Sequence, residues 1–423
     1  MKIAFVTQPR DGIGKNTSLG IITIELALAL SKEFEILIYG KRNQNIKEQS
    51  YENTKIKYKY VTIKLDDFII KPVLKILNRL GLNRNKRMPG FASSFYYLIY
   101  ASLIGLDTRI QNCPVIHIHN YSQFVPVIRF FNPKAKIVLH MNCEWLTQIH
   151  KPLIEKRLKK ADLVLSCSDF VTQRNKEIFP GLKGLFHTLH NGVNTGEFTC
   201  SRTFKPEKNK RKILFTGRVS PEKGVHILVD AFNMIAEKFP ELELEIIGPQ
   251  GASSFITELD DNPVIKDLAH FYHGKDYFTF IKSKIKPELQ DRVRFLGSVD
   301  HTKLPEYYRN SDIFVFPSVW NEPFGIPVVE AMASCLPVIA AKSGGITEIL
   351  DNGTYGLTVE CSNTLQLAGA LELLLTDNDL MNRFAKAGKC RAEESFSWKY
   401  IAECLIKFYN LDLRKNPPAV IQQ

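Results

Sequence analysis

The sequence lacks closely spaced cysteines. It has eight cysteines in 423 residues, and none of them forms a C-x-x-C pair. This spacing excludes a zinc ribbon, a zinc knuckle and a paired-thiol redox site. Scattered cysteines in a chain of this length are typical of buried, reduced side chains. We therefore expect a cytoplasmic protein.

The sequence also lacks a long apolar segment. Its longest nearly apolar run, residues 95–106, is shorter than the roughly 18 residues that a bilayer-spanning helix needs. The opening MKIAFVT is interrupted by QPRD too early for a signal peptide. We expect no membrane-spanning segment, and at most a peripheral contact with the inner face of the plasma membrane.

Acidic side chains are scarce in the first half of the chain only. Residues 1–200 contain 29 Lys and Arg against 15 Asp and Glu, a net charge of +14, whereas residues 201–423 contain 27 and 29, a net charge of −2. Because no basic stripe is interleaved with aromatic residues, we expect no nucleic-acid partner. An anionic partner for the first half stays open.

Strand-like apolar runs alternate with amphipathic helical patterns, which predicts parallel sheets covered by helices. We expect strands at 3–7, 34–39, 115–119, 136–140, 163–166, 185–189, 212–216, 242–247, 293–296, 313–317 and 338–340, and residues 55–64 are also strand-like. The polar, aperiodic segment 200–211 is typical of a linker. The prediction is an α/β fold of two Rossmann-like, doubly wound domains, residues 1–203 and 204–398, with a helix at about 399–415 that packs back on the first. Ligands would bind at the strand C-termini where the domains meet.

Segment 217–224 (GRVSPEKG) follows a predicted strand and opens a helix. Arg218 and Lys223 would place a planar fork and a point charge beside a helix N-terminus, a combination that binds a diphosphate well. The alternative is that both are solvated charges in an ordinary loop.

Segment 321–327 (NEPFGIP) lies between a predicted strand and a helix. Gly325 permits close backbone approach, so the N–H groups of Phe324, Gly325 and Ile326 would point at a phosphate. Glu322 and Glu330 could accept hydrogen bonds from different hydroxyls of one elongated ligand, such as a sugar and a ribose. The alternative for Glu330 is a charge that stabilises the helix dipole.

These motifs resemble the donor domain of GT-B glycosyltransferases, in the retaining group 1 (family 4) set that includes sucrose-phosphate synthases and bacterial mannosyltransferases. The resemblance runs in order through GRVSPEKG, NEPFGIPVVEAMASCLPVIAAKSGGITEIL and DNGTYGL, over about residues 210–400. Glu322 and Glu330 match the family's E-x7-E motif. The resemblance implies two domains that face each other across a cleft. It also implies that Glu322 contacts the donor sugar, Glu330 the ribose, and Arg218 and Lys223 the leaving diphosphate.

The resemblance is thinner in the first half. Gly14 lies where the family has a Gly-Gly turn at the donor phosphates, although here the two glycines are separated. The same stretch is no P-loop, because Pro9 stands at the required first glycine and Asn16 follows the lysine. His140 matches the histidine that the family places beside the transferred sugar, which implies a hydrogen bond to the sugar or to its developing charge.

Two other motifs resemble metal-binding motifs, but neither is sufficient to predict a metal site. His117 and His119 form a His-x-His pair, but no third ligand is evident at a typical spacing, and the favoured interpretation of His117 is a satisfied core imidazole. Residues 377–379 (DND) spell the D-x-D of metal-dependent glycosyltransferases of the other main fold, yet helix capping is the simpler account. We expect no metal and no cofactor besides a nucleotide-diphosphate sugar as co-substrate.

Together the motifs predict metal-independent transfer of a hexosyl group, with retention, from a nucleotide sugar to a glycan, lipid-linked or other hydroxyl acceptor. The expected role is cell-surface polysaccharide or glycoconjugate biosynthesis. The predicted catalytic residues are His140, Arg218, Lys223 and Glu322, and the predicted donor-binding residues are Gly14, Arg218, Lys223, Glu322, Phe324, Gly325, Ile326 and Glu330.

Two alternatives stay open: a sugar-nucleotide epimerase or hydrolase on the same fold, and a non-catalytic sugar-nucleotide-binding structural protein. The basic, apolar-laced stretch 71–95 is a candidate surface for an anionic membrane or lipid-linked acceptor. The alternative for that stretch is a solvated helix that covers the core.

Overall fold

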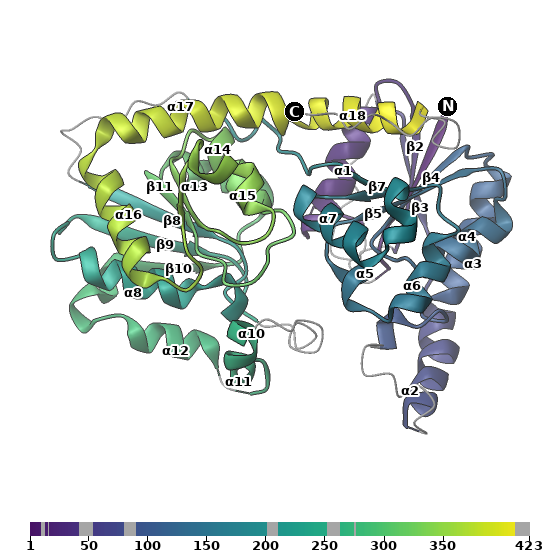
Figure 1. Cartoon of the computed structure of the whole chain (residues 1–423), viewed down its shortest axis with the longest axis horizontal. Helices are drawn as coiled ribbons and strands as arrows, with labels where there is room; N and C mark the ends of the chain where they lie inside the picture. Colours follow the sequence, from purple (N-terminus) through teal and green to yellow (C-terminus); the bar gives the residue numbers. More distant parts are fainter. Residues whose placement is uncertain are drawn as a thin grey trace. The chain divides into compact units, whose positions relative to one another are not determined.

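The chain folds into two compact units (Figure 1). The computed structural model describes residues 1–9, 13–15, 17–41, 54–79, 90–200, 210–251, 263–274 and 276–410. The first unit comprises the residues up to Asn191 and the C-terminal helix that begins at Trp398, and the second unit comprises Gly192–Ser397. Most of the predicted linker, 201–209, lies outside the described residues. Within those ranges, no helix has both the length and the apolar character to cross a membrane.

The first unit contains a seven-stranded parallel sheet in the order β3-β2-β1-β4-β5-β6-β7. Its central strands are buried on both faces, as their unbroken apolar runs require in a parallel sheet. The strands are β1 (Lys2–Val6), β2 (Glu35–Gly40), β3 (Ile56–Tyr60), β4 (Val115–His119), β5 (Lys136–Met141), β6 (Leu163–Ser166) and β7 (Phe186–Thr188).

The helices of this unit include the last helix that the structure describes. They are α1 (Ser18–Leu30), the π-helix η1 (Asp66–Ile70), α2 (Lys71–Arg79), η2 (Gly90–Ala92), α3 (Leu98–Ile110), α4 (Phe124–Phe131), α5 (Trp145–Gln148), α6 (Lys151–Leu158), α7 (Asp169–Ile178), η3 (Pro180–Leu185) and α18 (Trp398–Asn410). Helix α18 packs on α1 through Ile401, Leu405 and Tyr409, which recur every four residues and are buried. Lys136 Nζ donates to the carbonyls of Phe408 (2.7 Å) and Tyr409 (2.9 Å), which complements the negative end of the helix dipole.

The second unit contains a six-stranded parallel sheet in the order β10-β9-β8-β11-β12-β13. Its strands are β8 (Arg211–Thr216), β9 (Leu242–Ile247), β10 (Val293–Gly297), β11 (Ile313–Phe316), β12 (Val338–Ala341) and β13 (Leu357–Val359). Its helices are η4 (Pro221–Lys223), α8 (Val225–Ile235), α10 (Pro263–Asp267), α11 (Ala269–Tyr272), α12 (Tyr277–Lys284), η5 (Pro287–Arg292), η6 (His301–Lys303), α13 (Leu304–Arg309), α14 (Ile326–Ala333), α15 (Ile346–Ile349), η7 (Asp351–Gly353), α16 (Thr364–Thr376) and α17 (Asn378–Ser395).

Both sheets have the strand order of a Rossmann fold. In each, the chain moves outward from the first strand to one edge and then returns to pair on the first strand's other side, between β1 and β4 and between β8 and β11. The loops that leave the two strands at such a switch point diverge, and ligands bind beyond the strand C-termini there. The predicted fold of two doubly wound α/β units is confirmed.

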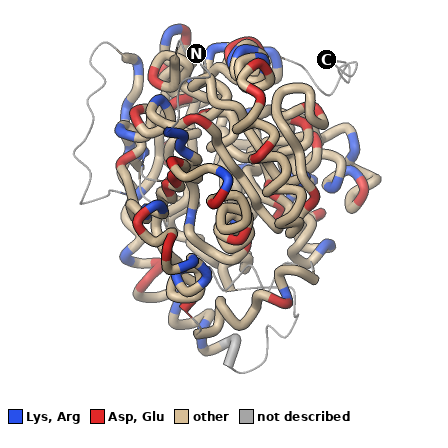
Figure 2. The backbone as a smooth tube through the Cα atoms, turned by 90° about the vertical axis from the view of Figure 1, so that its left-hand side faces the viewer, with Lys and Arg blue, Asp and Glu red and all other residues tan. Residues whose placement is uncertain are grey.

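The described residues also test smaller predictions. Every predicted strand is present, with its ends shifted by a few residues at most, but β13 was not predicted because it has three residues and only one of them is buried. Asp377 caps α17, with its carboxylate accepting from the Leu380 N–H at 2.8 Å, so the DND motif has the predicted capping role. Lysine and arginine are interspersed with aspartate and glutamate along the chain (Figure 2).

Helix α18 should contribute to the stability of the first unit. Leu405 is fully buried and Glu403 is exposed on the same helix. Leu405→Ala should cost about 2–5 kcal/mol of unfolding free energy because it leaves a cavity, whereas Glu403→Ala should stay within about 0.5 kcal/mol. Hydrogen exchange of the β1 and β4 amides measures both. Equal protection in the two variants would show that α18 does not stabilise this sheet.

Candidate functional site

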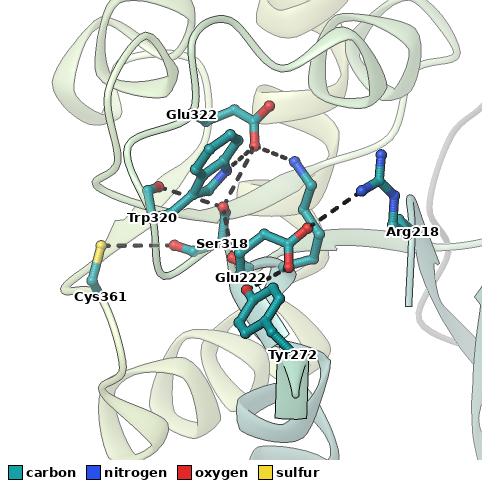
Figure 3. Close-up of polar contacts among 8 residues, drawn as sticks. Arg218, Glu222, Tyr272, Ser318, Trp320, Glu322 and Cys361 are labelled. Atoms are coloured by element: carbon teal, nitrogen blue, oxygen red, sulfur yellow. Dashed lines mark hydrogen bonds and ion pairs between the residues drawn. The ribbon is translucent and has the colours of Figure 1, made fainter. Parts of the chain in front are cut away.

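Two loops at the switch point of the second unit are fastened to each other. The first follows β8 and contains η4, and the second follows β11. The Glu222 carbonyl in the first loop accepts hydrogen bonds from the Val319 N–H at 3.0 Å and from Ser318 Oγ at 3.2 Å. These contacts bring together three of the predicted residues, Arg218, Lys223 and Glu322 (Figure 3).

Two glycines let neighbouring segments approach the loop that carries Glu322. Gly224 has φ +67°, and a Cβ there would lie 2.0 Å from the Pro317 carbonyl oxygen. Gly344 has φ +52°, and a Cβ there would lie 2.2 Å from the Glu322 carbonyl oxygen, which accepts from the Gly345 N–H at 2.8 Å. Only glycine combines that backbone conformation with that lack of space. The loop that carries Glu322 is therefore held by a glycine at both ends.

Lys223 and Glu322 form a half-buried ion pair. Lys223 Nζ lies 2.5 Å from Glu322 Oε2, and the two side chains are 15% and 12% exposed. The Trp320 indole N–H donates to the same oxygen at 3.0 Å (Figure 3). The ammonium also lies 5.6 Å from the Phe316 ring centroid and 5.4 Å from that of Trp320, within cation–π range. The Phe316 and Trp320 side chains thus help to fix the position of this ion pair.

Arg218 is positioned by a carboxylate that the sequence analysis did not single out. Glu222 has a side chain that is 1% exposed, and its Oε1 lies 3.9 Å from Arg218 Nη1. The Tyr272 hydroxyl donates to Glu222 Oε2 at 2.8 Å (Figure 3), because burial and the nearby Glu222 charge raise the pKa of Tyr272 and keep it protonated. The Arg218 side chain is 43% exposed, so its guanidinium faces buried Glu222 on one side and is accessible from solvent on the other.

Glu330 has separate partners from Glu322. It lies in α14 and accepts from His301 Nε2 at 2.7 Å and from the Tyr308 hydroxyl at 2.9 Å. Burial, then the Glu330 charge, holds the pKa of Tyr308 well above its usual range, so Tyr308 donates to Glu330 and accepts from Thr216 Oγ1 at 2.6 Å. The two carboxylates of the E-x7-E motif therefore occupy two different polar environments.

The remaining predicted residues of this unit lie where the second loop enters α14. The helix begins at Ile326 with Gly325 as its N-cap, so its first N–H groups have no acceptor within the helix. Phe324 is buried, with its ring centroid 5.8 Å from that of Phe396. The loop thus anchors in the core through Phe324, and the helix N-terminus contributes partial positive charge.

Gly14 and His140 lie in the first unit. Gly14 lines a small pocket with Thr7, Gln8 and Thr17, and Lys15 pairs with Glu25 of α1. His140 is buried in β5, with its Nδ1 at 3.1 Å from His117 Nε2. Burial lowers the pKa of His140 to about 4, so its imidazole is neutral at neutral pH. Asp11 and Gly12, which belong to the same predicted turn as Gly14, lie outside the described residues.

The residues that support the predicted ones were not predicted from the sequence. These are Glu222, Tyr272, Ser318, Trp320, His301 and Tyr308. Glu222 lies inside the GRVSPEKG motif, so its position in the loop predicted to bind a diphosphate was a usable signal. Tyr272, His301 and Tyr308 come from helices distant in sequence, and no local spacing indicates them.

Comparison with known proteins shows what the second unit is similar to. Residues 200–391 match the family described as Glycosyl transferases group 1, which confirms the predicted resemblance over this segment. Spore coat protein SA of Bacillus subtilis is 27% identical over 327 residues, which cover 73% of this chain and 81% of that protein. Glycogen synthase of Mycobacterium tuberculosis is 25% identical over 321 residues, which cover 72% of this chain and 70% of that protein.

A solved structure shows the same fold over nearly the whole chain. The crystal structure of Alr3699/HepE from Anabaena in complex with UDP-glucose matches with a TM-score of 0.66 and 19% sequence identity, covering 96% of this chain and 99% of that protein. The fold is that of the GT-B glycosyltransferases, as predicted.

The glycine at the meeting of the two loops should be irreplaceable. Gly224→Ala should destabilise the second unit by more than about 1 kcal/mol, because alanine disfavours φ +67° and its methyl group would strike the Pro317 carbonyl. The matched control is Gly369 in α16, where a Cβ would meet no atom within 4 Å. Gly369→Ala should stabilise by about 0.5–1 kcal/mol. Hydrogen exchange of the β8 and β11 amides reports both signs, and a neutral Gly224→Ala would contradict the steric argument.

Proposed function

We propose that this protein transfers a hexosyl group from a nucleotide-diphosphate sugar to a hydroxyl of a glycan or lipid-linked acceptor, with retention at the anomeric carbon. The observation that carries the proposal is the cluster of Arg218, Lys223 and Glu322 at the β8–β11 switch point, in the segment that matches group 1 glycosyl transferases. The expected setting is polysaccharide or glycoconjugate biosynthesis.

The leaving diphosphate is the part of the donor that this cluster suits best. When the bond between the sugar C1 and the phosphate oxygen breaks, its electron pair stays on the phosphate and positive charge develops on the sugar. Lys223, Arg218 and the N-terminus of α14 supply positive charge from fixed positions, which is preorganised electrostatic stabilisation. With two side-chain cations and a helix end available, we propose that the diphosphate needs no metal ion.

The carboxylates would bind the hydroxyls of the same donor. Glu322 would accept from a sugar hydroxyl while it keeps its contact with Lys223, because the Lys223 ammonium has three N–H donors and can also donate to phosphate. Glu330 would accept from the ribose while it keeps His301 and Tyr308, because each carboxylate oxygen accepts more than one hydrogen bond. In the first unit, we propose that the neutral imidazole of His140 hydrogen-bonds the transferred sugar, and that the turn at Gly14 contacts the donor.

The donor and the type of reaction are open to direct test. The Anabaena protein is described with UDP-glucose bound, which supports a nucleotide sugar here and makes UDP-glucose the first candidate. A thermal-shift screen of UDP-, GDP- and ADP-sugars would find the donor, and product analysis with and without acceptor fractions would follow. Transfer only in the presence of acceptor supports the proposal, whereas free sugar or an epimerised nucleotide without acceptor would favour the hydrolase or epimerase alternative.

The two cations should be necessary for turnover. Lys223→Ala and Arg218→Ala should each lower the rate of nucleoside-diphosphate release by about 100-fold or more, because each removes preorganised charge from the leaving group. Lys386→Ala is the matched control, since Lys386 is exposed on α17 and should leave the rate unchanged. Near-normal turnover in both site variants would refute the assignment.

We also propose a membrane contact for the first unit through a protruding apolar surface on η1 and α2, which we call the η1–α2 surface. Helix α2 extends away from the sheet of its own unit (Figure 1). Phe68 is 83% exposed, and Leu65, Ile69, Val73 and Ile76 are also exposed. Lys64 and Lys75 are exposed beside them. Exposed apolar side chains flanked by lysines fit the interface of an anionic bilayer. Residues 80–89 of the predicted stretch lie outside the described residues.

Hydrogen bonds and an ion pair fix the position of the η1–α2 surface on the first unit. Buried Asp66 accepts from the N–H groups of Ile99 at 3.0 Å and Tyr100 at 2.8 Å, which ties η1 to the start of α3. Lys71 pairs with Asp67 at 2.5 Å and donates to the Tyr97 hydroxyl at 2.9 Å. Lys71 therefore has a structural role, and the exposed Lys64 and Lys75 are the lysines that we propose contact lipid headgroups.

Vesicle sedimentation tests this contact. Phe68→Ser should weaken binding to phosphatidylglycerol-containing vesicles severalfold, because insertion of an exposed aromatic ring is lost. Phe130→Ser is the matched control, since Phe130 is 80% exposed at the end of α4 in the same unit. Binding that ignores both substitutions and the lipid charge would overturn the membrane proposal and leave the donor chemistry untouched.

A further inference from the structure

Three histidines converge in the first unit, although their sequence spacing gave no complete metal motif. Strands β4 and β5 pair in parallel with His119 opposite His140, and His117 lies two residues before His119 on the same face. One ring nitrogen from each residue lies within 4.8 Å of the other two. The three residues are 0%, 0% and 1% exposed. The third ligand that the His-x-His spacing lacked is thus supplied by the neighbouring strand.

The ring-nitrogen spacing suits coordination of one ion. His117 Nε2 and His140 Nδ1 are 3.1 Å apart. Two nitrogens bound to one tetrahedral Zn²⁺ at about 2.0–2.1 Å would be about 3.3 Å apart. A small shift of these two rings therefore admits an ion between them.

His119 provides an independent observation. Both of its ring nitrogens are buried, and neither has a hydrogen-bond partner among the described residues. Buried polar atoms nearly always have a partner, and an exception calls for an unseen ion or water. The Phe5 ring stacks against His119 at 5.8 Å and lies 4.9 Å from His117, so this aromatic neighbour contacts the His119 ring without offering it a hydrogen bond.

The remaining nitrogen of His117 is already oriented. His117 Nδ1 lies 2.8 Å from the Tyr409 hydroxyl of α18. A metal-bound histidine typically donates its other N–H to an oxygen that fixes the ring and its tautomer. With Nδ1 engaged in this way, Nε2 of His117 faces His140 and the space between the three rings.

We propose that His117, His119 and His140 form a binding site for a divalent transition-metal ion, with Zn²⁺ as the expected ion. Three imidazoles leave a fourth tetrahedral position for a water or hydroxide. Occupancy engages His140, the residue proposed to contact the transferred sugar, so Zn²⁺ inhibits transfer; this second statement rests on the proposed function.

Cobalt binding tests the site without any enzymatic assay. The full chain, freed of metal with a chelator, is titrated with Co²⁺, whose visible absorption reports tetrahedral coordination. We expect one equivalent to bind and Zn²⁺ to displace it. His119→Gln should weaken binding at least 100-fold, and Tyr409→Phe by about 10–100-fold because it removes the oxygen that orients His117. Circular dichroism verifies the fold of each variant.

The matched control is His226→Gln in the second unit, since His226 also hydrogen-bonds a tyrosine, Tyr277, at 2.7 Å but lies outside the histidine cluster. It should bind Co²⁺ like the wild type. Absence of a tetrahedral Co²⁺ spectrum in the wild type would overturn the site, as would an unchanged affinity in folded His119→Gln.

The inhibitory role has its own readout. Where transfer activity is present, Zn²⁺ should lower its rate at the occupancy measured with Co²⁺ competition, a chelator should restore it, and His119→Gln should lose this sensitivity. Full activity at saturating Zn²⁺ would overturn inhibition while the spectrum still supports the site. Because the spectrum needs no donor, failure of the proposed function and failure of the metal site are seen separately.

Discussion

The close approach of the β8 and β11 loops is the constraint on which the second unit's site depends. Gly224 lies against the Pro317 carbonyl, and Gly344 lies against the backbone of Glu322. A side chain at either position would clash with the backbone of the loop that carries Glu322. The site is thus built by backbone contact first, and the charged side chains occupy positions that the backbone has already fixed.

The two carboxylates Glu222 and Glu322 have different partners in this site. The Glu222 side chain is 1% exposed, lies near Arg218 and accepts a hydrogen bond from Tyr272. Glu322 instead pairs with Lys223, and both of these side chains are partly exposed. A buried charge is costly unless it is paired and hydrogen-bonded, and each of these carboxylates is. The cost is compensated before a ligand arrives, so the proposed binding of a donor phosphate would require little reorganisation.

Much of this architecture was predictable from the sequence, and the reasons differ by level. The strands are continuous apolar runs between turns, so β4, β6 and β9 were predicted to the residue. Arg218, Lys223 and Glu322 were predicted because each lies just after a strand, where parallel sheets collect their ligand residues. Their supports were not, because Tyr272, His301 and Tyr308 reach the site through tertiary packing. The alignment of His140 with the His-x-His pair likewise depends on strand register, which no single segment encodes.

The two ends of the second unit lie together, which determines the order in which the units are completed during synthesis. The Val193 N–H donates to the Phe396 carbonyl at 2.7 Å, and Val193 forms a β-bridge with Ser397. The first and last residues of the second unit therefore lie together, and this unit is an insertion within the first. The first unit therefore stays incomplete during synthesis until the whole of the second has emerged. Its closing helix, α18, brings Tyr409 to His117. The hydroxyl that contacts the histidine cluster is thus synthesised after the whole second unit, and a chain truncated before α18 would have a complete second unit and an incomplete first one.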